Sequence, residues 1–190
     1  EFSHVFKHFA ASAVLAAGVF ATSLAVAADR ITIELKDGPV VIELNDKAPE
    51  HAARFKALAE AGEYDNVAFH RVIDGFMAQT GDVEFGDMEN GYQANRAGTG
   101  GSSQPDLKTD FTDQPFERGT VGMARAQNPD SANSQFFIMF DEGSFLNGQY
   151  TVVGHVVSGM ENVDKIKRGD QAANGMVENP DRMIKVTVGG

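Results

Sequence analysis

One arginine and two glutamines in this chain stand among large apolar residues, at positions that a soluble protein would normally bury. Arg71 and Gln79 lie in the apolar run 69–79, and Gln135 begins the run 135–140. Burying such polar groups without hydrogen-bond partners is costly, so we expect them to line a shared, partly open pocket. The simpler alternative is that the apolar residues are core and that Arg71 reaches solvent along its aliphatic stem.

Other chemically capable side chains are less consistent with a site. Residues 98–101, Gly-Thr-Gly-Gly, lack the Lys and the Ser or Thr of a phosphate loop and are interpreted as a flexible turn. The acids from Asp82 to Glu89 miss the calcium-loop spacing and are interpreted as a solvated loop. The histidines include no pair at metal-ligand spacing, and we expect a structural role for His70. The sequence therefore predicts no metal and no cofactor, and it gives little support to covalent or acid-base catalysis.

Residues 1–28 have the pattern of a secretory signal peptide. Lys7 lies near the start, residues 9–26 are apolar, and small residues at 25–28 offer a cleavage site before Asp29. The competing interpretation is an uncleaved membrane anchor, because the apolar stretch approaches spanning length. Cleavage is favoured because the many alanines make the segment weakly hydrophobic. It would leave one domain, residues 29–190, in the periplasm and without a membrane attachment.

This domain is acidic. The whole chain has a formal charge of −11, and residues 1–28 contribute one acid, Glu1, and one base, Lys7, so residues 29–190 keep the full charge. That charge argues against nucleic acid and anionic lipid as partners. The absence of cysteine excludes disulfides, thiolate chemistry and cysteine-ligated zinc, and it fits an oxidising compartment. No large apolar face remains unexplained, which favours a monomer.

The spacing of apolar residues predicts many short strands and two helices. Residues 31–36 and 40–44 alternate as a hairpin around Asp37-Gly38, and helical spacing covers residues 48–59 and 160–166. The other expected strands are residues 68–73, 76–80, 119–126, 134–140, 150–157 and 183–188. Such a chain indicates an antiparallel barrel or sandwich, and we favour a barrel with its open ends covered by the helices. Residues 81–116 and 170–181 remain as long loops.

Strand parity predicts which side chains share a face, because successive side chains of a strand point to opposite sides. The expected same-face groups are Gln135 with Phe137 and Met139, Met77 with Gln79, and Phe69 with Arg71. Only one face of each strand can fill a barrel, so the face with Gln135 must be covered or must form a site.

Several ordered motifs resemble those of cyclophilins, which are peptidyl-prolyl cis-trans isomerases. They span nearly all of residues 29–190 and are Phe-His-Arg at 69–71, Gly-Phe-Met-x-Gln at 75–79, Gly-Thr-Gly-Gly at 98–101, Met-Ala at 123–124, Ser-Gln-Phe-Phe-Ile at 134–138 and Leu-x-Gly at 146–148. The resemblance implies a mainly β fold, a closed eight-stranded antiparallel β-barrel capped by two α-helices. It also implies a cofactor-independent rotamase for Xaa–Pro bonds that assists the folding of secreted or periplasmic proteins.

The same resemblance implies roles for individual residues, with Arg71 as the catalytic arginine. Substrate-binding roles fall to Phe76, Met77, Phe137 and Leu146 in the proline pocket, Gln79 and Gln135 beside Arg71, Ala124 and Arg125 along the groove, and Phe145 and Tyr150. Arg71 would donate a hydrogen bond to the lone pair that the prolyl nitrogen regains when the amide twists, which is a contact made only in the transition state.

Three of these positions depart from the most familiar cyclophilins. Phe145 stands where many members have tryptophan, Tyr150 where many have histidine, and Arg125 where asparagine is common. The changes at positions 145 and 150 are similar to those of bacterial periplasmic cyclophilins. Because the missing indole removes a hydrogen-bond donor and contact area, we expect only weak cyclosporin binding, while isomerisation survives.

Two other functions fit parts of the pattern. One is a proline-peptide binding module or holdase chaperone with incidental isomerase activity, since the apolar groove and residues 81–116 could both contact proteins. The other is a small β-barrel that binds an apolar metabolite in its interior, against which bulky inward residues such as Ile42 and Phe136 argue.

Overall fold

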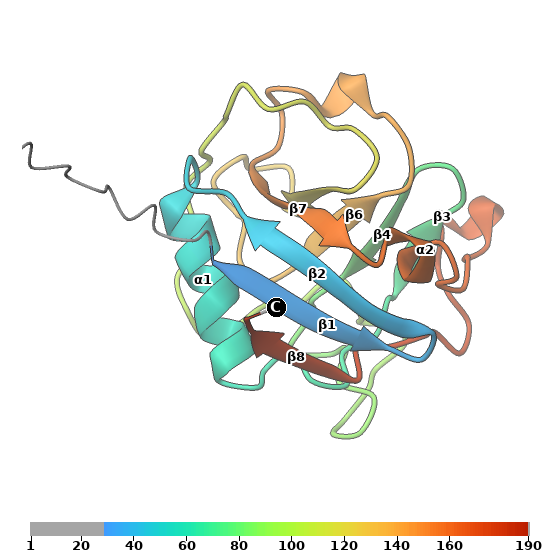
Figure 1. The fold of residues 1–190 in the computed structure, drawn as a ribbon. Coiled ribbons are helices and arrows are strands. Elements are labelled where there is room, and N and C mark those ends of the chain that lie inside the picture. The colour runs from blue at the N-terminus through green and yellow to red at the C-terminus, as the bar shows by residue number, and fades with distance from the viewer. Residues whose placement is uncertain (1–28, 190) are drawn as a thin grey trace, which may run out of the picture.

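The computed structural model describes residues 29–189, so the expected signal peptide lies outside the described residues. Within them, eight strands form one antiparallel sheet in the order β3-β4-β6-β5-β7-β2-β1-β8 (Figure 1). The strands are β1 (Arg30–Leu35), β2 (Gly38–Leu44), β3 (Arg71–Ile73), β4 (Met77–Thr80), β5 (Thr120–Met123), β6 (Phe136–Met139), β7 (Val152–Ser158) and β8 (Lys185–Val188). The α-helices are α1 (Pro49–Glu60) and α2 (Met160–Val163), and short 3₁₀ helices span Ser144–Leu146 and Gln171–Ala173.

The β1–β2 hairpin confirms the predicted alternation. Ile33 pairs with Val40, both are buried, and Gly38 takes the positive φ of 135° that the turn requires. Helix α1 begins at Pro49, and it lies beside β1 and β8 at one end of the sheet (Figure 1).

Helix α2 is shorter than the predicted helix over residues 160–166. Val163 and Ile166 are both buried, as their spacing indicates. The backbone bonds after α2 join residues three apart, from Lys165 to Asn162 and from Ile166 to Val163, so the helix tightens into turns while its apolar stripe continues into the core.

The main core fills the concave side of the sheet. The rings of Phe55 from α1 and Phe136 from β6 meet edge to face with centroids 4.5 Å apart. Tyr64 packs against both rings and donates its hydroxyl to the carbonyl of Ser134 at 2.7 Å. This contact fixes the entry to β6 immediately beside Gln135.

The predicted closed barrel is wrong, because the sheet is open between β3 and β8. Within residues 29–189 only single bridges span this gap, among them Ala68 to Arg182 and Arg71 to Met176. The intervening segment holds Asn179 at a φ of 49° followed by Pro180, which has no N–H to donate. A continuous ladder therefore cannot form there, and the sheet remains a half-barrel.

Both edge strands of the open sheet are nevertheless covered. On β3, the N–H of Val72 donates to Gly175 and its carbonyl accepts from Gly169, each at 2.8 Å. On β8, the N–H of Val186 donates to the carboxylate of Asp65 at 2.9 Å. The chain's own connections thus occupy both backbone groups of Val72 on one edge and the N–H of Val186 on the other.

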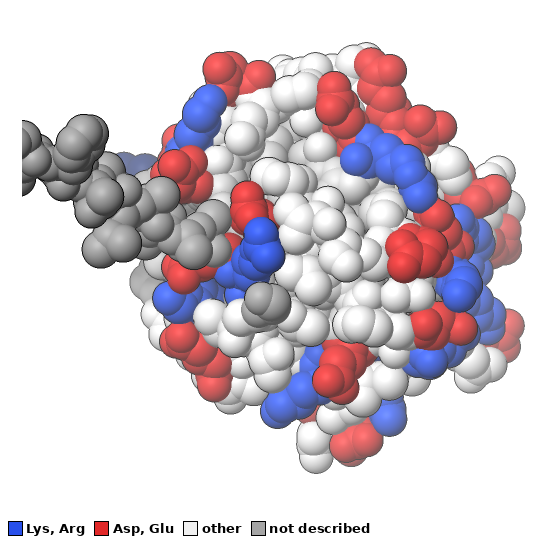
Figure 2. Space-filling view, in the orientation of Figure 1, with Lys and Arg blue, Asp and Glu red and all other residues white. Residues whose placement is uncertain are grey.

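The surface carries charges of both signs despite the acidic total. Figure 2 shows Lys and Arg interspersed with Asp and Glu around a central area without charge. Several are paired, including Arg30 with Glu43 and Lys36 with Asp181. Among residues 29–189, no helix has the length and apolar character needed to cross a bilayer.

Candidate functional site

Arg71 is the first residue of β3 and is held from two sides. Its Nη1 donates to Oε1 of Gln79, its cross-strand partner, at 3.2 Å. Its Nε donates to the backbone carbonyl of Asn174 at 3.0 Å, and its Nη2 donates to Oδ1 of the same residue at 3.0 Å. A guanidinium has five N–H groups, so three are used within the described residues and two remain open.

The half-buried position of Arg71 also affects its electrostatics. Burial lowers the pKa of the guanidinium from its ordinary value of 12.5. A guanidinium stays charged in proteins, so Arg71 supplies a permanent cation that is partly shielded from water. A cation in such surroundings interacts more strongly with a lone pair or carbonyl than it would in bulk water.

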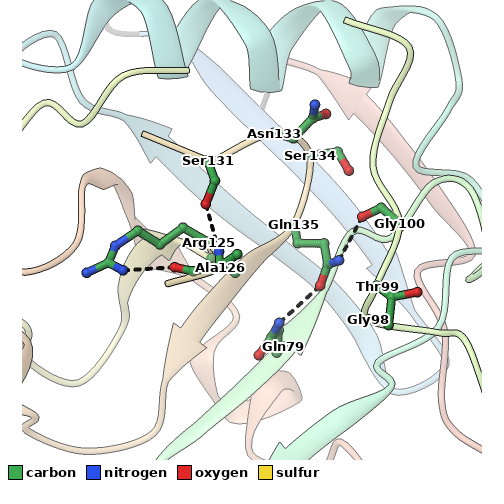
Figure 3. Close-up of a pocket in the computed structure, with 11 residues that line it drawn as sticks. Gln79, Gly98, Thr99, Gly100, Arg125, Ala126, Ser131, Asn133, Ser134 and Gln135 are labelled. Atoms are coloured by element: carbon green, nitrogen blue, oxygen red, sulfur yellow. Dashed lines mark hydrogen bonds between the residues drawn. The ribbon is translucent and has the colours of Figure 1, made fainter. Parts of the chain in front are cut away.

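Two glutamines continue the hydrogen bonding away from Arg71. The Nε2 of Gln79 donates to Oε1 of Gln135 at 3.0 Å, and Nε2 of Gln135 donates to the carbonyl of Gly100 at 2.8 Å. Figure 3 shows Gln135 between Gln79 and Gly100, with both bonds drawn. The carbonyl of Gly100 can only accept, so it determines which way each amide points and leaves the oxygen of Gln79 facing Arg71.

A pocket of about 120 Å³ lies beside Arg71, and we call it the apolar pocket because Phe76, Met77, Phe137 and Leu146 line it along with the polar side chains. Nine of the eleven residues expected at the site line it, namely Arg71, Phe76, Met77, Gln79, Ala124, Arg125, Phe137, Leu146 and Tyr150. Parity is confirmed here, because Met77, Phe137 and Met139 belong to one cluster while Phe136 and Ile138 belong to the main core.

The floor of this pocket depends on two residues that the sequence did not single out. Phe116 stacks on Phe137 with ring centroids 5.7 Å apart. Gly122 lies against both rings, and a Cβ on it would clash with Phe137 and would lie 2.6 Å from Phe116. A glycine is therefore required for the two rings to pack, and the rings in turn close the pocket from below.

The remaining expected residues lie at the margins. Gln135 lines a neighbouring hollow of about 360 Å³ that shares Gln79, Ala124 and Arg125 with the apolar pocket. Phe145 lines neither and is 69% exposed, with its ring 5.6 Å from that of Phe76. The two hollows therefore form one groove, and Phe145 stands on its rim.

Arg125 acts mainly as part of the wall of the groove, and it contributes less to the charge of the groove. Its guanidinium donates to the carbonyls of Gln149 at 2.8 Å and Ala126 at 2.9 Å (Figure 3). It also lies over the ring of Tyr150, 4.5 Å from the centroid. These contacts join the segment after β5 to the segment before β7 along one side of the groove.

Asn174 is a site residue that the sequence does not reveal, because the pattern predicts only a loop over residues 170–181. It ends the 3₁₀ helix Gln171–Ala173 with a φ of 54°, in the left-handed region that asparagine tolerates. The Asn-Gly pair at 174–175 is a turn signal. Nothing in the sequence connects that turn with Arg71, which lies 103 residues away.

Three other expectations need correction. Phe69 does not share a face with Arg71, because β3 begins only at Arg71 and Phe69 turns into the main core. Asp82 is not part of a solvated loop, since it is 0% exposed. Residues 98–101 are not a free turn, because the N–H groups of Gly98 and Gly100 donate to Asp82.

His70 is buried at 7% exposure, and neither ring nitrogen has a hydrogen-bond partner among the described residues. Burial lowers its pKa below the ordinary value of 6.5. A Cβ on Gly98 would lie 2.9 Å from the ring, so His70 packs directly beneath the loop that carries Gly100. Its neutral ring serves as a spacer there.

Comparisons with known proteins show the family of this chain. The family described as "Cyclophilin type peptidyl-prolyl cis-trans isomerase/CLD" matches residues 30–188. A probable peptidyl-prolyl cis-trans isomerase of Brucella suis is 60% identical over 190 residues, covering 98% of this chain and 97% of that protein. Peptidyl-prolyl cis-trans isomerase B of Escherichia coli is 36% identical, covering 77% of this chain and 88% of that protein.

Solved structures share the fold. The crystal structure of a Cryptosporidium parvum cyclophilin type peptidyl-prolyl cis-trans isomerase, in the presence of the dipeptide Ala-Pro, superposes with a TM-score of 0.67. It is 24% identical and covers 85% of this chain and 99% of that one. A cyclophilin of Hirschia baltica superposes with a TM-score of 0.68 at 24% identity, covering 83% of this chain and 73% of that one.

Proposed function

The chain belongs to the family of cyclophilin-type peptidyl-prolyl cis-trans isomerases, and we propose that Arg71 is the residue that lowers its barrier to Xaa–Pro rotation. One observation carries this proposal. Arg71 is fixed by three of its N–H groups and keeps two open beside an apolar pocket. A cation that is held rigidly at the wall of an apolar pocket can stabilise a transition state by a hydrogen bond, in a reaction that has neither a proton transfer nor a covalent step.

Uncatalysed rotation about an Xaa–Pro bond takes on the order of tens to hundreds of seconds, because twisting the bond breaks amide resonance. At the twisted midpoint the prolyl nitrogen becomes pyramidal and regains a lone pair. An open N–H of Arg71 donates to that lone pair, which hardly exists in the planar ground state. The contact therefore stabilises the transition state more than the substrate, which is the condition for raising kcat.

The pocket supports this step by receiving the proline ring. Met77, Phe137 and Leu146 are buried apolar side chains that exclude water around the ring. Exclusion of water strengthens the hydrogen bond from Arg71 and disfavours the more polar planar amide. The adjoining hollow beside Gln135 receives the residues that precede proline, so the substrates are proline-containing polypeptides.

The setting of this activity is also part of the proposal. We place the enzyme in the periplasm after removal of residues 1–28, where it assists the folding of secreted proteins. Support comes from the apolar stretch at 9–26, the small residues before Asp29 and the absence of cysteine. Mass spectrometry of the protein recovered from a periplasmic extract would show Asp29 as the first residue, and an intact leader would contradict this placement.

The proposal includes two further binding properties, one from the rim of the groove and one from the edges of the sheet. Phe145 offers ring area on the rim but no indole N–H, so cyclosporin binds weakly. The covered sheet edges support a monomer. Titration with cyclosporin and sedimentation of the mature domain test these two statements.

Magnetisation-exchange NMR on an Xaa–Pro peptide, with the mature wild type and Arg71→Ala, tests the catalytic proposal. We expect the variant to lose about 2–4 kcal/mol of transition-state stabilisation, roughly a 30- to 1,000-fold fall in rate, with its fold retained. A variant that exchanges the peptide as fast as wild type would remove Arg71 from the mechanism. Tight peptide binding without accelerated exchange, in both proteins, would favour the alternative of a binding module or holdase.

A further inference from the structure

Asp82 is an unusual carboxylate, because it is completely buried in the connection between β4 and β5 and yet forms no ion pair within residues 29–189. Backbone N–H groups satisfy it instead. Its Oδ1 accepts from Glu84 at 3.1 Å and Phe85 at 2.9 Å. Its Oδ2 accepts from Gly98 at 2.7 Å and Gly100 at 3.0 Å.

The two oxygens of Asp82 thus have different tasks. The bonds of Oδ1 close a local turn two and three residues onward, as aspartates often do. The bonds of Oδ2 reach 16 and 18 residues along the chain and hold the loop that contains Gly98 and Gly100. A local turn needs only the first pair of bonds, so the second pair calls for another explanation.

Gly100 connects this carboxylate with the site. Its N–H donates to Asp82, while its own carbonyl accepts from Gln135 at 2.8 Å. A Cβ on Gly100 would lie 2.5 Å from Oδ1 of Asp82, so only glycine can approach the carboxylate this closely. The position of the Gly100 carbonyl is therefore set by Asp82 rather than by a strand ladder.

That carbonyl is the end of a hydrogen-bonded series that runs through Gln135 to Gln79 (Figure 3) and from Gln79 to Arg71. A glutamine amide can turn over and exchange its oxygen for its nitrogen. If Gln135 lost its acceptor at Gly100, its amide and that of Gln79 could both reverse. Gln79 would then present an NH₂ group to the guanidinium of Arg71, and the bond at 3.2 Å would become a repulsion.

We propose that Asp82 is a positioning residue for isomerisation, acting on Arg71 through Gly100, Gln135 and Gln79. This inference rests on the catalytic role proposed for Arg71. Asp82 contacts neither the apolar pocket nor the neighbouring hollow. It affects turnover because it fixes the donor and acceptor direction of two amides, and peptide affinity depends on it little.

The same loop provides a matched control in Asp87. Its Oδ1 also accepts from the backbone two and three residues onward, from Glu89 at 2.9 Å and Asn90 at 3.1 Å. Its Oδ2 accepts from the side chain of Asn90 at 3.0 Å, with no bond to residues 98–100. Asp82→Asn and Asp87→Asn therefore make the same chemical change in equivalent turns, and only the first affects the loop beside Gln135.

The test measures catalysed exchange of an Xaa–Pro peptide and its dissociation constant for both variants. We expect Asp82→Asn to lower the catalysed rate about tenfold, to change the dissociation constant by less than about twofold, and to shift the Arg71 Nε–H resonance. Asp87→Asn should change the catalysed rate and the dissociation constant by less than about twofold, and it should leave the Arg71 Nε–H resonance where it is in the wild type. A wild-type rate in Asp82→Asn would overturn the proposal.

A second variant distinguishes a positioning role of Asp82 from a general loosening of the loop. In Gln135→Ala the series is already broken, so adding Asp82→Asn should lower the rate by less than about twofold further. A full tenfold fall in that background would show that Asp82 acts by another route, and the proposal would fail.

A steric variant covers the case in which Asp82→Asn does not fold. Gly100→Ala places a Cβ 2.5 Å from Oδ1 of Asp82 and therefore displaces the loop from the carboxylate without removing the charge, so it should give the same fall in rate. An unchanged rate would overturn the inference. Arg71→Ala is measured alongside. If Arg71→Ala is fully active, the proposed function has failed; if it is inactive while Asp82→Asn is active, only the positioning role has failed.

Discussion

The two sides from which Arg71 is held are built very differently. On one side Gln79 lies on β4, whose register is fixed by ladders to both β3 and β6. On the other side Asn174 lies at the end of a single 3₁₀ turn, in a connection that has one isolated bridge to β3, between Arg71 and Met176. One side belongs to the sheet, and the other is a left-handed residue in a loop.

This difference shows that the precision of the site does not come from regular structure alone. A strand places Gln79 in line with Arg71 but offers only one acceptor to the guanidinium. The loop offers two acceptors from one residue, a carbonyl and a side-chain oxygen, because the left-handed backbone of Asn174 turns both toward Arg71. Substitutions that affect one side or the other should therefore have different consequences.

The largest effect is expected when both sides are lost together. In Arg71→Lys a positive charge remains, but an ammonium has no planar fork to meet Gln79 and Asn174 at the same time. We expect the catalysed exchange rate to fall about 100-fold with an unchanged thermal midpoint. A variant with more than about a third of the wild-type rate would show that charge alone suffices and that neither side matters.

Removing only the sheet side is expected to be the next largest change. Gln79→Ala deletes the acceptor for Nη1 and the donor to Oε1 of Gln135, at a cost of about 1.5–2 kcal/mol, or roughly 10- to 30-fold in rate. The exchange experiment at saturating peptide measures this. Thr80→Ser, on the same strand but facing the core, is the control and should stay within about twofold of wild type.

The loop side can be tested in two steps. Asn174→Gly removes the side-chain acceptor but keeps the carbonyl and the left-handed backbone, so we expect only about a threefold fall in rate. Asn174→Ala adds backbone strain of about 1 kcal/mol, which should appear as a lower thermal midpoint. If Asn174→Gly matched Gln79→Ala in effect, the two sides would be equivalent and the contrast drawn above would be wrong.

The smallest effect on catalysis is expected from pH, because neither side titrates near neutrality. Arg71 stays charged, so the exchange rate should be flat between about pH 6.5 and 9. Stability should behave differently, since burial lowers the pKa of both His51 and His70 below 6.5. The unfolded chain then binds more protons as the pH falls below 6.5, and the unfolding free energy should drop by about 1–3 kcal/mol by pH 5.

Denaturant unfolding at a series of pH values measures that drop, with His155→Gln at an exposed position as the control. His70→Gln should flatten part of the dependence, because the group that must take up a proton is gone. A steep change in the exchange rate over the same range would place a titrating group in the mechanism.

Much of the part of the site that lies on the sheet could be predicted from the sequence, because side chains on a strand alternate between its two faces. The alternation of Phe136 and Phe137 separated the core from the site correctly. It failed for Phe69, since the strand did not extend that far. The closed barrel failed for a similar reason, because strand patterns do not reveal whether the two outermost strands can pair.

The part of the site that lies on loops could not be predicted, because no periodic pattern of side chains describes a loop. Asn174 and Asp82 meet their partners across long separations in sequence, and both are held by turns whose consequences appear only in three dimensions. Phe116 lies at the end of the long connection 81–116, where nothing marked it as the support of Phe137. The polar composition of these segments predicted that they are solvated, and this prediction is wrong for the buried Asp82.

The bonds at the edges of the open sheet have a consequence for the proposed action on polypeptide substrates. Extended chains readily add as an extra strand to a free sheet edge, and such pairing can seed aggregation. Gly169 and Gly175 occupy both backbone groups of Val72 on one edge, and Asp65 occupies the N–H of Val186 on the other. These bonds hinder the addition of an extended chain at Val72 and Val186, and under the proposed function they leave the groove as the place where a polypeptide substrate binds.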